Sequence, residues 1–155
     1  MPKAKAIPDG YPQLTPYICV DPADQAIEFY KKVFGAKERM RMPSPGGKIG
    51  HAELQIGSSL LMLADEHPEV GALSPKSVGG TPVTLSLYVE DVDSVFEKAT
   101  AAGARSLRDV RDEFYGDRTG QFEDPFGHRW SVATHVEDVS PEEMARRAEA
   151  MAGAS

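Results

Sequence analysis

The sequence predicts an α+β protein made of two βαβββ modules and a C-terminal helix. Strand and helix patterns follow one another in the same order in both halves of the 155-residue chain. Some residues also match between the halves: Val20-Asp21 and Gly35-Ala36 correspond to Val89-Glu90 and Gly103-Ala104. Matches at a nearly constant spacing indicate an internal repeat. A proline and two glutamates after Ser140 are typical of the start of one further helix.

Residues 14–66 are predicted to form the first module. They follow an N-terminal arm, residues 1–13, which is rich in Pro, Gly and Lys and lacks periodicity. The module opens with a short β-prone stretch, residues 15–20. Asp21 is then predicted to cap a helix whose first residue is Pro22. Apolar residues spaced three and four apart predict this helix, and Gly35 is expected to end it.

Three strands are expected after this helix. They lie at residues 37–42, 51–56 and 60–64. Gly57-Ser58 separates the last two and suits a two-residue hairpin turn. Residues 67–80, with Gly, Pro, Ser and acidic side chains, are interpreted as the linker between the modules.

Residues 81–138 are predicted to form the second module, and residues 139–155 the C-terminal helix and tail. Asp91 is the expected cap of its helix. The turn Asp124-Pro125-Phe126-Gly127 predicts a hairpin. The strands expected in this half are residues 83–89, 105–108, 114–123 and 128–134.

The composition of the chain argues against nucleic acid and membranes as binding partners. The net charge of −7 argues against nucleic acid, because phosphate binding favours a basic surface. No apolar run is long enough to cross a membrane, and the N-terminus lacks the apolar core of a secretory signal, so a cytoplasmic location is expected. The single cysteine, Cys19, lies in an apolar stretch and is interpreted as a core thiol.

Three segments resemble the glyoxalase/bleomycin resistance/dioxygenase group, the vicinal-oxygen-chelate superfamily. They are residues 18–30 with Phe34-Gly35-Ala36, residues 87–93, and residues 124–130. Tyr115-Gly-Asp-Arg-Thr-Gly120 before the last turn resembles the PhnB-like branch. The resemblance implies βαβββ modules whose sheets curl around a concave cavity, and a homodimer.

Metal-using members of this superfamily bind a divalent ion with His, Gln or Glu at four positions. Carried over residue by residue, these positions fall on Thr15, Met62, Thr84 and Ser131. Hydroxyl groups and a thioether are poor ligands for such ions. No metal site and no cofactor are therefore expected, and a metal-dependent glyoxalase or dioxygenase is disfavoured. The four side chains are interpreted as ligand contacts.

Strand alternation places other polar groups on the same face. With the Gly57-Ser58 turn, Glu53 lies opposite Met62, so His51, Glu53 and Gln55 share the face of Met62. Glu53 and His51 are candidate acid–base groups, with burial expected to raise the pKa of Glu53. Alternatively, Glu53 is a ligand contact or pairs with Arg118 or Arg129 without chemistry.

Aromatic and cationic side chains complete the candidate site. Tyr17 and Tyr88 share the strand faces of Thr15 and Thr84 and could stack on a planar ligand, or be core or rim aromatics. Arg118 could bind an anionic group, or form an ion pair with Asp117 or Glu123.

Two functions remain open from the sequence. The first is a metal-free small-molecule-binding protein of the glyoxalase/bleomycin resistance type. The second is a lyase or isomerase that uses Glu53 and His51 as acid–base groups or around an unconventional metal. The fold alone does not choose between them, because one fold supports many functions.

Overall fold

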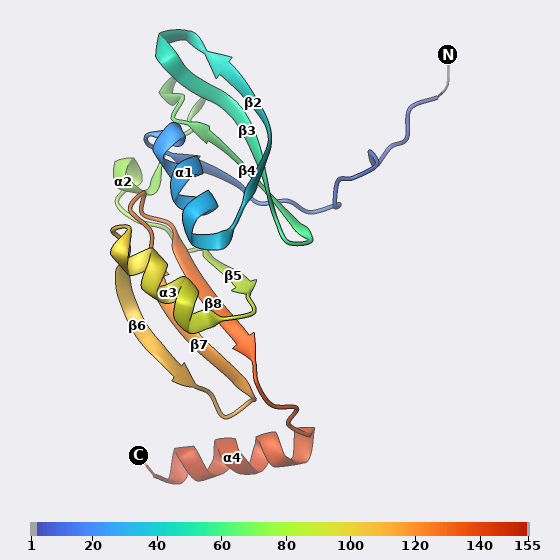
Figure 1. Cartoon of the computed structure of the whole chain (residues 1–155), viewed down its shortest axis with the longest axis vertical. Helices are drawn as coiled ribbons and strands as arrows, with labels where there is room; N and C mark the ends of the chain where they lie inside the picture. Colours follow the sequence, from blue (N-terminus) through green and yellow to red (C-terminus); the bar gives the residue numbers. More distant parts are fainter. Residues whose placement is uncertain (1–2, 155) are drawn as a thin grey trace. The chain divides into compact units, whose positions relative to one another are not determined.

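The chain divides into two compact units, one ending at Gly80 and one beginning at Thr81. The computed structural model describes residues 3–154. Within these residues each unit contains a four-stranded sheet with a helix packed against it (Figure 1). The predicted α+β class with two βαβββ modules is therefore confirmed. The concave cavity stays a prediction.

In the first unit the sheet has the strand order β1-β4-β3-β2. β1 runs parallel to β4, and the other neighbours are antiparallel. The elements are β1 (Tyr17–Val20), α1 (Ala23–Phe34), β2 (Lys37–Ser44), β3 (Lys48–Ile56) and β4 (Ser59–Asp65). The order matches the prediction, and each of the last three strands is longer than expected.

α1 covers one face of this sheet and leaves the other without a helix. The apolar residues of α1, among them Ile27 and Tyr30, are fully buried. They pack on the strand residues whose side chains alternate toward the helix, such as Ala52, Leu54 and Leu63, which are also fully buried. We call the opposite surface the helix-free face of the first sheet.

The start of α1 corrects the predicted cap. The helix begins at Ala23, and its N-cap residue is Pro22, which has no side-chain acceptor. Asp21 therefore does not cap it. Asp65 at the end of β4 does so instead: its Oδ1 accepts from the Ala23 amide at 2.8 Å, while its Oδ2 accepts from the Ile49 amide at 2.7 Å. One carboxylate thus ties the helix to two strands.

The hairpin register agrees with the prediction. Gly57 and Ser58 form the two-residue turn between β3 and β4, with Glu53 opposite Met62 and Gln55 opposite Leu60. The segment after β4 is more ordered than expected for a linker. It contains a short 3-10 turn, Pro68–Val70, and a one-turn helix, α2 (Pro75–Val78).

The second unit repeats the topology, with strand order β5-β8-β7-β6. Here Asp91 caps the helix as predicted, accepting from the Ser94 amide at 3.1 Å. Thr134 at the end of β8 accepts from the Val92 amide at 2.9 Å. The elements are β5 (Thr84–Tyr88), α3 (Val92–Ala101), β6 (Arg105–Asp112), β7 (Asp117–Glu123) and β8 (Arg129–His135).

Equivalent pairs in the two sheets confirm the internal repeat in three dimensions. Leu63 pairs with Ala52 in the first sheet, and Val132 pairs with Gly120 in the second. Gly120 lies directly beneath α3. A Cβ on Gly120 would stand 2.8 Å from the ring of Phe96, so the small residue allows the close packing of helix and sheet.

The predicted C-terminal helix is present as α4 (Pro141–Gly153), which Figure 1 shows past the end of β8. Ser140 caps it, accepting from the Glu143 amide at 3.2 Å. All of its residues lie in the described part of the chain, and none of them is buried. Arg147 connects it to the unit by donating to the Phe114 carbonyl at 3.1 Å and pairing with Glu137 at 2.5 Å. Among residues 3–154, no helix is long and apolar enough to span a bilayer.

Candidate functional site

A row of side chains crosses the helix-free face of the first sheet. Tyr17 pairs with Met62, Met62 with Glu53, and Glu53 with Met40, so these four residues stand side by side on β1, β4, β3 and β2. His51 lies two residues before Glu53 on β3 and therefore shares its face. The sequence-predicted residues Tyr17, His51, Glu53 and Met62 are thus brought together.

Hydrogen bonds link the polar members of this row. Tyr17 Oη lies 2.8 Å from His51 Nδ1, and His51 Nε2 lies 2.9 Å from Glu53 Oε2. Because a carboxylate only accepts, His51 Nε2 carries a proton here. In a neutral imidazole Nδ1 is then the acceptor, and the Tyr17 hydroxyl donates to it.

Tyr11, which belongs to the predicted N-terminal arm, completes the cluster. Its hydroxyl donates to Glu53 Oε1 at 2.7 Å, so both carboxylate oxygens are hydrogen-bonded. Glu53 is only 4% exposed. A lone aromatic in a Pro- and Gly-rich arm was the only available signal for Tyr11, and it does not specify a partner. We call Tyr11, Tyr17, His51 and Glu53 the Glu53 cluster.

The ionisation of Glu53 differs from the expectation. The hydrogen bond from His51 lowers the pKa of Glu53; burial raises it, and the Tyr11 hydroxyl lowers it further, so that the net shift is downward. The predicted rise in the pKa of Glu53 was wrong, because the hydrogen bonds from His51 and Tyr11 outweigh the effect of burial. Glu53 is therefore a buried anion at neutral pH. Its hydrogen bond to Tyr11 is also the largest cause of the raised pKa of Tyr11, and desolvation raises the pKa of Tyr17.

The other residues expected in the first unit lie outside the cluster. Gln55 is exposed at the hairpin end of β3, where its amide donates to the Gly57 carbonyl at 3.1 Å. Thr15 is half-buried and precedes β1. Both carboxylate oxygens of Glu53 are hydrogen-bonded within the first unit, to His51 and Tyr11, and the alternative pairing with Arg118 or Arg129 stays a prediction.

In the second unit the predicted residues lie on the helix-free face of the second sheet. Ser131 pairs with both Ser86 and Gln121, and Thr84 and Tyr88 have the same alternation as Ser86. Thr84 and Tyr88 are exposed, and Ser131 is half-buried.

A second carboxylate cluster near Tyr88 was not predicted from the sequence. The Tyr88 hydroxyl donates to Asp117 Oδ2 at 2.6 Å, and His135 Nδ1 lies 2.8 Å from Asp117 Oδ1. Burial raises the pKa of Asp117, but the hydrogen bonds from Tyr88 and His135 outweigh it and give a net lowering. Asp138 on the other side of the imidazole is the first cause of the raised pKa of His135. Sequence distance hid this contact, because Tyr88 and Asp117 lie on different strands.

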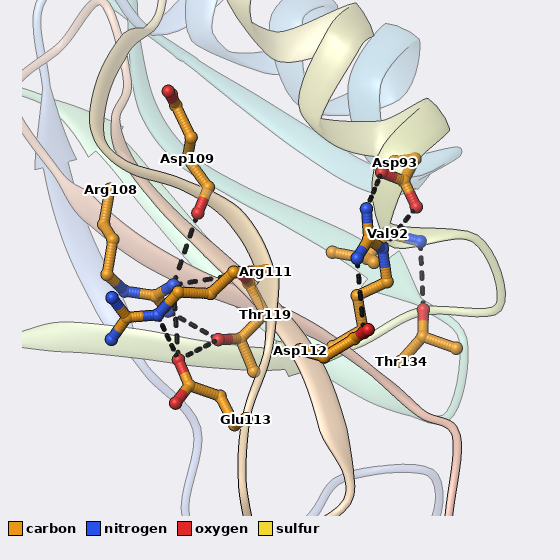
Figure 2. A network of polar contacts seen from close by, with 10 residues as sticks. Val92, Asp93, Arg108, Asp109, Arg111, Asp112, Glu113, Thr119 and Thr134 are labelled. Carbon is orange, nitrogen blue, oxygen red and sulfur yellow. Dashed lines mark hydrogen bonds and ion pairs between the residues drawn. The ribbon is translucent and has the colours of Figure 1, made fainter. Parts of the chain in front are cut away.

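Arg118 occupies a different surface. Its guanidinium forms two hydrogen bonds of 2.9 Å to Asp93 at the start of α3 and one of 3.2 Å to Asp112 on β6. Asp93 and Asp112 are labelled in the network of Figure 2. The expected partners Asp117 and Glu123 were wrong, because β7 alternation turns Arg118 to the helix side of the sheet. These three hydrogen bonds hold the guanidinium of Arg118 against Asp93 and Asp112, so Arg118 is not among the proposed ligand contacts.

The side chains at the four inferred metal positions do not fit a divalent ion. Thr15, Thr84 and Ser131 offer neutral hydroxyls and Met62 a thioether, which lack the charge and the basicity that such ions prefer. Among residues 3–154, no group of three or more His, Cys, Asp or Glu side chains is arranged to hold a metal ion.

Two βαβββ units with polar, helix-free sheet faces define the class of protein, and comparison with known proteins agrees with it. Residues 12–132 match the family model described as the Glyoxalase/Bleomycin resistance protein/Dioxygenase superfamily. An uncharacterised protein of Mycobacterium tuberculosis is 44% identical over 136 residues, which cover 86% of this chain and 80% of that protein. The chain belongs to the glyoxalase/bleomycin resistance protein/dioxygenase superfamily.

Solved structures show the same fold. The crystal structure of TioX from Micromonospora sp. ML1 matches with a TM-score of 0.64 and 28% identity, covering 81% of this chain and 99% of TioX. A PhnB protein from Bacillus cereus matches with a TM-score of 0.62 over 79% of this chain and 99% of that protein. Its identity is 18%, so this likeness shows the fold alone.

Proposed function

We propose that this protein binds a small organic molecule without a metal ion, and that the helix-free face of its first sheet contacts the ligand. The Glu53 cluster carries the proposal. It places a buried anion, an imidazole and two tyrosines beside Met40 and Met62 on one surface. Few polar groups set among aromatic and apolar side chains are typical of small-molecule sites.

The exposed ring of Tyr17 supports a role in ligand contact. Tyr17 is 54% exposed although it lies in the sheet, next to Met62. An exposed aromatic beside a thioether offers a flat apolar surface on which a planar ligand can stack. Thr84, Tyr88 and Ser131 remain proposed ligand contacts of the second sheet, and Thr15 of the first.

A thermal-shift screen with aromatic and cationic small molecules tests this function. We expect a subset of compounds to raise the melting temperature of the wild type, because a ligand that binds only the folded state stabilises it. Tyr17→Ala should abolish these shifts. Tyr115→Ala, which removes a partly exposed tyrosine from the second unit, should retain them. If no compound stabilises the wild type, the binding function is wrong.

Metal content tests the metal-free part of the proposal. The protein is incubated with zinc, nickel, cobalt or manganese, desalted and analysed by mass spectrometry. We expect far less than one metal per chain, because the four inferred positions lack suitable ligands. A retained ratio near one metal per chain would contradict the proposal and favour an enzyme with an unconventional metal site.

A lyase or isomerase is the second candidate function. The observation that favours it is the 2.9 Å contact between His51 Nε2 and Glu53 Oε2, with Tyr17 on the other imidazole nitrogen. Such a chain can move a proton. The lowered pKa makes Glu53 a weak base, which favours the binding function over this one. Glu53→Gln should abolish turnover of a substrate if the enzyme exists, and an active variant would exclude this mechanism.

Finer assignments complete the proposal. The PhnB-like branch is proposed from the resemblance of residues 115–120. A homodimer is proposed from the family resemblance, and sedimentation of the full chain tests it, with a monomer as the contrary result. A cytoplasmic location stays a prediction from the sequence.

A further inference from the structure

The side chain that covers Glu53 comes from outside the sheet. Tyr11 precedes β1, and its hydroxyl donates to Glu53 Oε1 at 2.7 Å. The guanidinium carbon of Arg39 lies 5.0 Å from the centroid of the Tyr11 ring, and Arg39 also donates to the Gly10 carbonyl at 3.1 Å. Tyr11 is therefore held as a phenol, with its ring against a cation and its hydroxyl on an anion.

The chain around Tyr11 is weakly attached. Residues 3–10 are all exposed, and Figure 1 shows this stretch running away from the sheet. The ion pair between Lys5 and Asp9 is also exposed. A segment that buries little apolar surface opens at a small free energy. Tyr11 can therefore leave Glu53 while the sheet stays folded.

Departure of Tyr11 would leave one oxygen of a buried carboxylate without a donor. His51 would still occupy Oε2, but Oε1 would lack a partner. A buried charge that loses a hydrogen bond is destabilised, so another donor is favoured there. The vacated space is bordered by the Arg39 guanidinium, which stacks on aromatic rings. Both features match an aromatic ring that carries a hydroxyl group.

We propose that Tyr11 is an internal stand-in for the ligand and that the site takes phenol-type molecules. The ligand's ring would lie beneath Arg39 in place of the Tyr11 ring, and its hydroxyl would donate to Glu53 Oε1 in place of the Tyr11 hydroxyl. Arm and ligand then compete for the same carboxylate. This inference rests on the ligand site proposed above, and it adds the chemical class of the ligand.

Chemical replacement of the missing side chain tests the inference. The variant Tyr11→Ala is titrated with para-cresol, which is the side chain of tyrosine as a free molecule, and binding is followed by calorimetry and by the NMR signals of the His51 ring. We expect para-cresol to bind Tyr11→Ala at least about tenfold more tightly than the wild type, the effect of one hydrogen bond to a charged group. Para-methylanisole, which lacks the hydroxyl proton, should not share this gain.

Two further variants control the test. Tyr115→Ala removes a tyrosine far from Glu53 in the sequence and should bind para-cresol no better than the wild type. Tyr11→Ala combined with Glu53→Gln should lose most of the gain, because the charged acceptor is gone. The inference would be overturned if the wild type and Tyr11→Ala bound para-cresol equally well, or if Tyr11→Ala bound para-cresol and para-methylanisole equally well. It would also be overturned if Tyr11→Ala did not bind para-cresol.

The outcome is separable from that of the proposed function. If the thermal-shift screen finds ligands whose affinity Tyr11→Ala leaves unchanged, the binding function stands and the stand-in role of Tyr11 is wrong. If the screen finds no ligand but Tyr11→Ala binds para-cresol selectively, the binding function of the wild type is wrong, whereas the stand-in role of the Tyr11 side chain at Glu53 is supported.

Discussion

Glu53 shows how two hydrogen bonds reverse the effect of burial on a carboxyl group. Burial disfavours the charged form, whereas donors to the carboxylate favour it. In this protein His51 and Tyr11 outweigh burial and lower the pKa of Glu53. Strand alternation was enough to place His51 and Glu53 on one face from the sequence. The Tyr11 contact could not be predicted, because no periodicity relates an irregular arm to a strand 42 residues away.

Replacement of Glu53 should therefore destabilise the protein in a pH-dependent way. The folded-state pKa lies below the unfolded value, so the stabilisation is present above the ordinary glutamate pKa of 4.5 and is lost as the pH falls through the lowered pKa. We expect Glu53→Gln to lower the free energy of unfolding at pH 7 by about 1–3 kcal/mol. Urea denaturation at several pH values would measure a deficit that shrinks in acid.

An exposed carboxylate provides the matched control. Glu97 on α3 is exposed, and Glu97→Gln should change the free energy of unfolding by less than about 0.5 kcal/mol at any of these pH values. A deficit of Glu53→Gln that is the same at pH 7 and pH 3 would contradict the assigned ionisation.

At the scale of elements, both βαβββ helices begin on a side chain from the end of the last strand in the same unit. Asp65 accepts from the first amide of α1, and Thr134 accepts from the first amide of α3, the latter drawn in Figure 2. α3 also has the local cap Asp91, which the sequence predicts correctly. The cap of α1 escaped prediction because Asp21-Pro22 has the expected residue types, whereas the actual acceptor is distant in sequence.

Two aspartate variants distinguish the predicted cap from the observed one. Asp65→Ala removes the acceptor for both the Ala23 and the Ile49 amides and should reduce the free energy of unfolding by about 1–3 kcal/mol. Asp21→Ala should stay within about 0.5 kcal/mol of the wild type, because Asp21 is exposed and is not the cap. Chemical denaturation of both variants measures the difference, and a larger loss in Asp21→Ala would refute this assignment.

Across the whole molecule, the repeat preserves register while exchanging side-chain size and chemistry. The buried helix residue Ile27 of the first unit corresponds to Phe96 of the second. The buried strand residue Ala52, which α1 covers, corresponds to Gly120 beneath α3. The larger helix residue goes with the smaller strand residue. Glu53 lies opposite Met62 in the first sheet, and Gln121 lies opposite Ser131 in the second. Met62 and Ser131 are equivalent positions, so Gln121 is the counterpart of Glu53. The sequence repeat predicted the shared topology, but not these local exchanges, which require the register.

Gly120 and Phe96 should therefore be energetically coupled. Gly120→Ala places a Cβ 2.8 Å from one ring carbon of Phe96 and 2.9 Å from Val110, and this overpacking should destabilise the protein by about 1–3 kcal/mol. Adding Phe96→Ile, which recreates the pairing of the first unit, should recover part of the loss. A double-mutant cycle by urea denaturation is expected to give a coupling of at least about 0.5 kcal/mol. Additive losses would show that the two sites are independent.

The distant cap of α1 has a consequence for synthesis of the chain on the ribosome. A nascent chain emerges N-terminus first, and domains fold as they emerge. The acceptor for the first amide of α1 is 42 residues downstream, so this helix lacks its cap until β4 has left the exit tunnel. α3 carries Asp91 immediately before its first turn and can be capped as soon as that turn emerges. The first half of the protein is thus expected to complete its helix late, and the second half early.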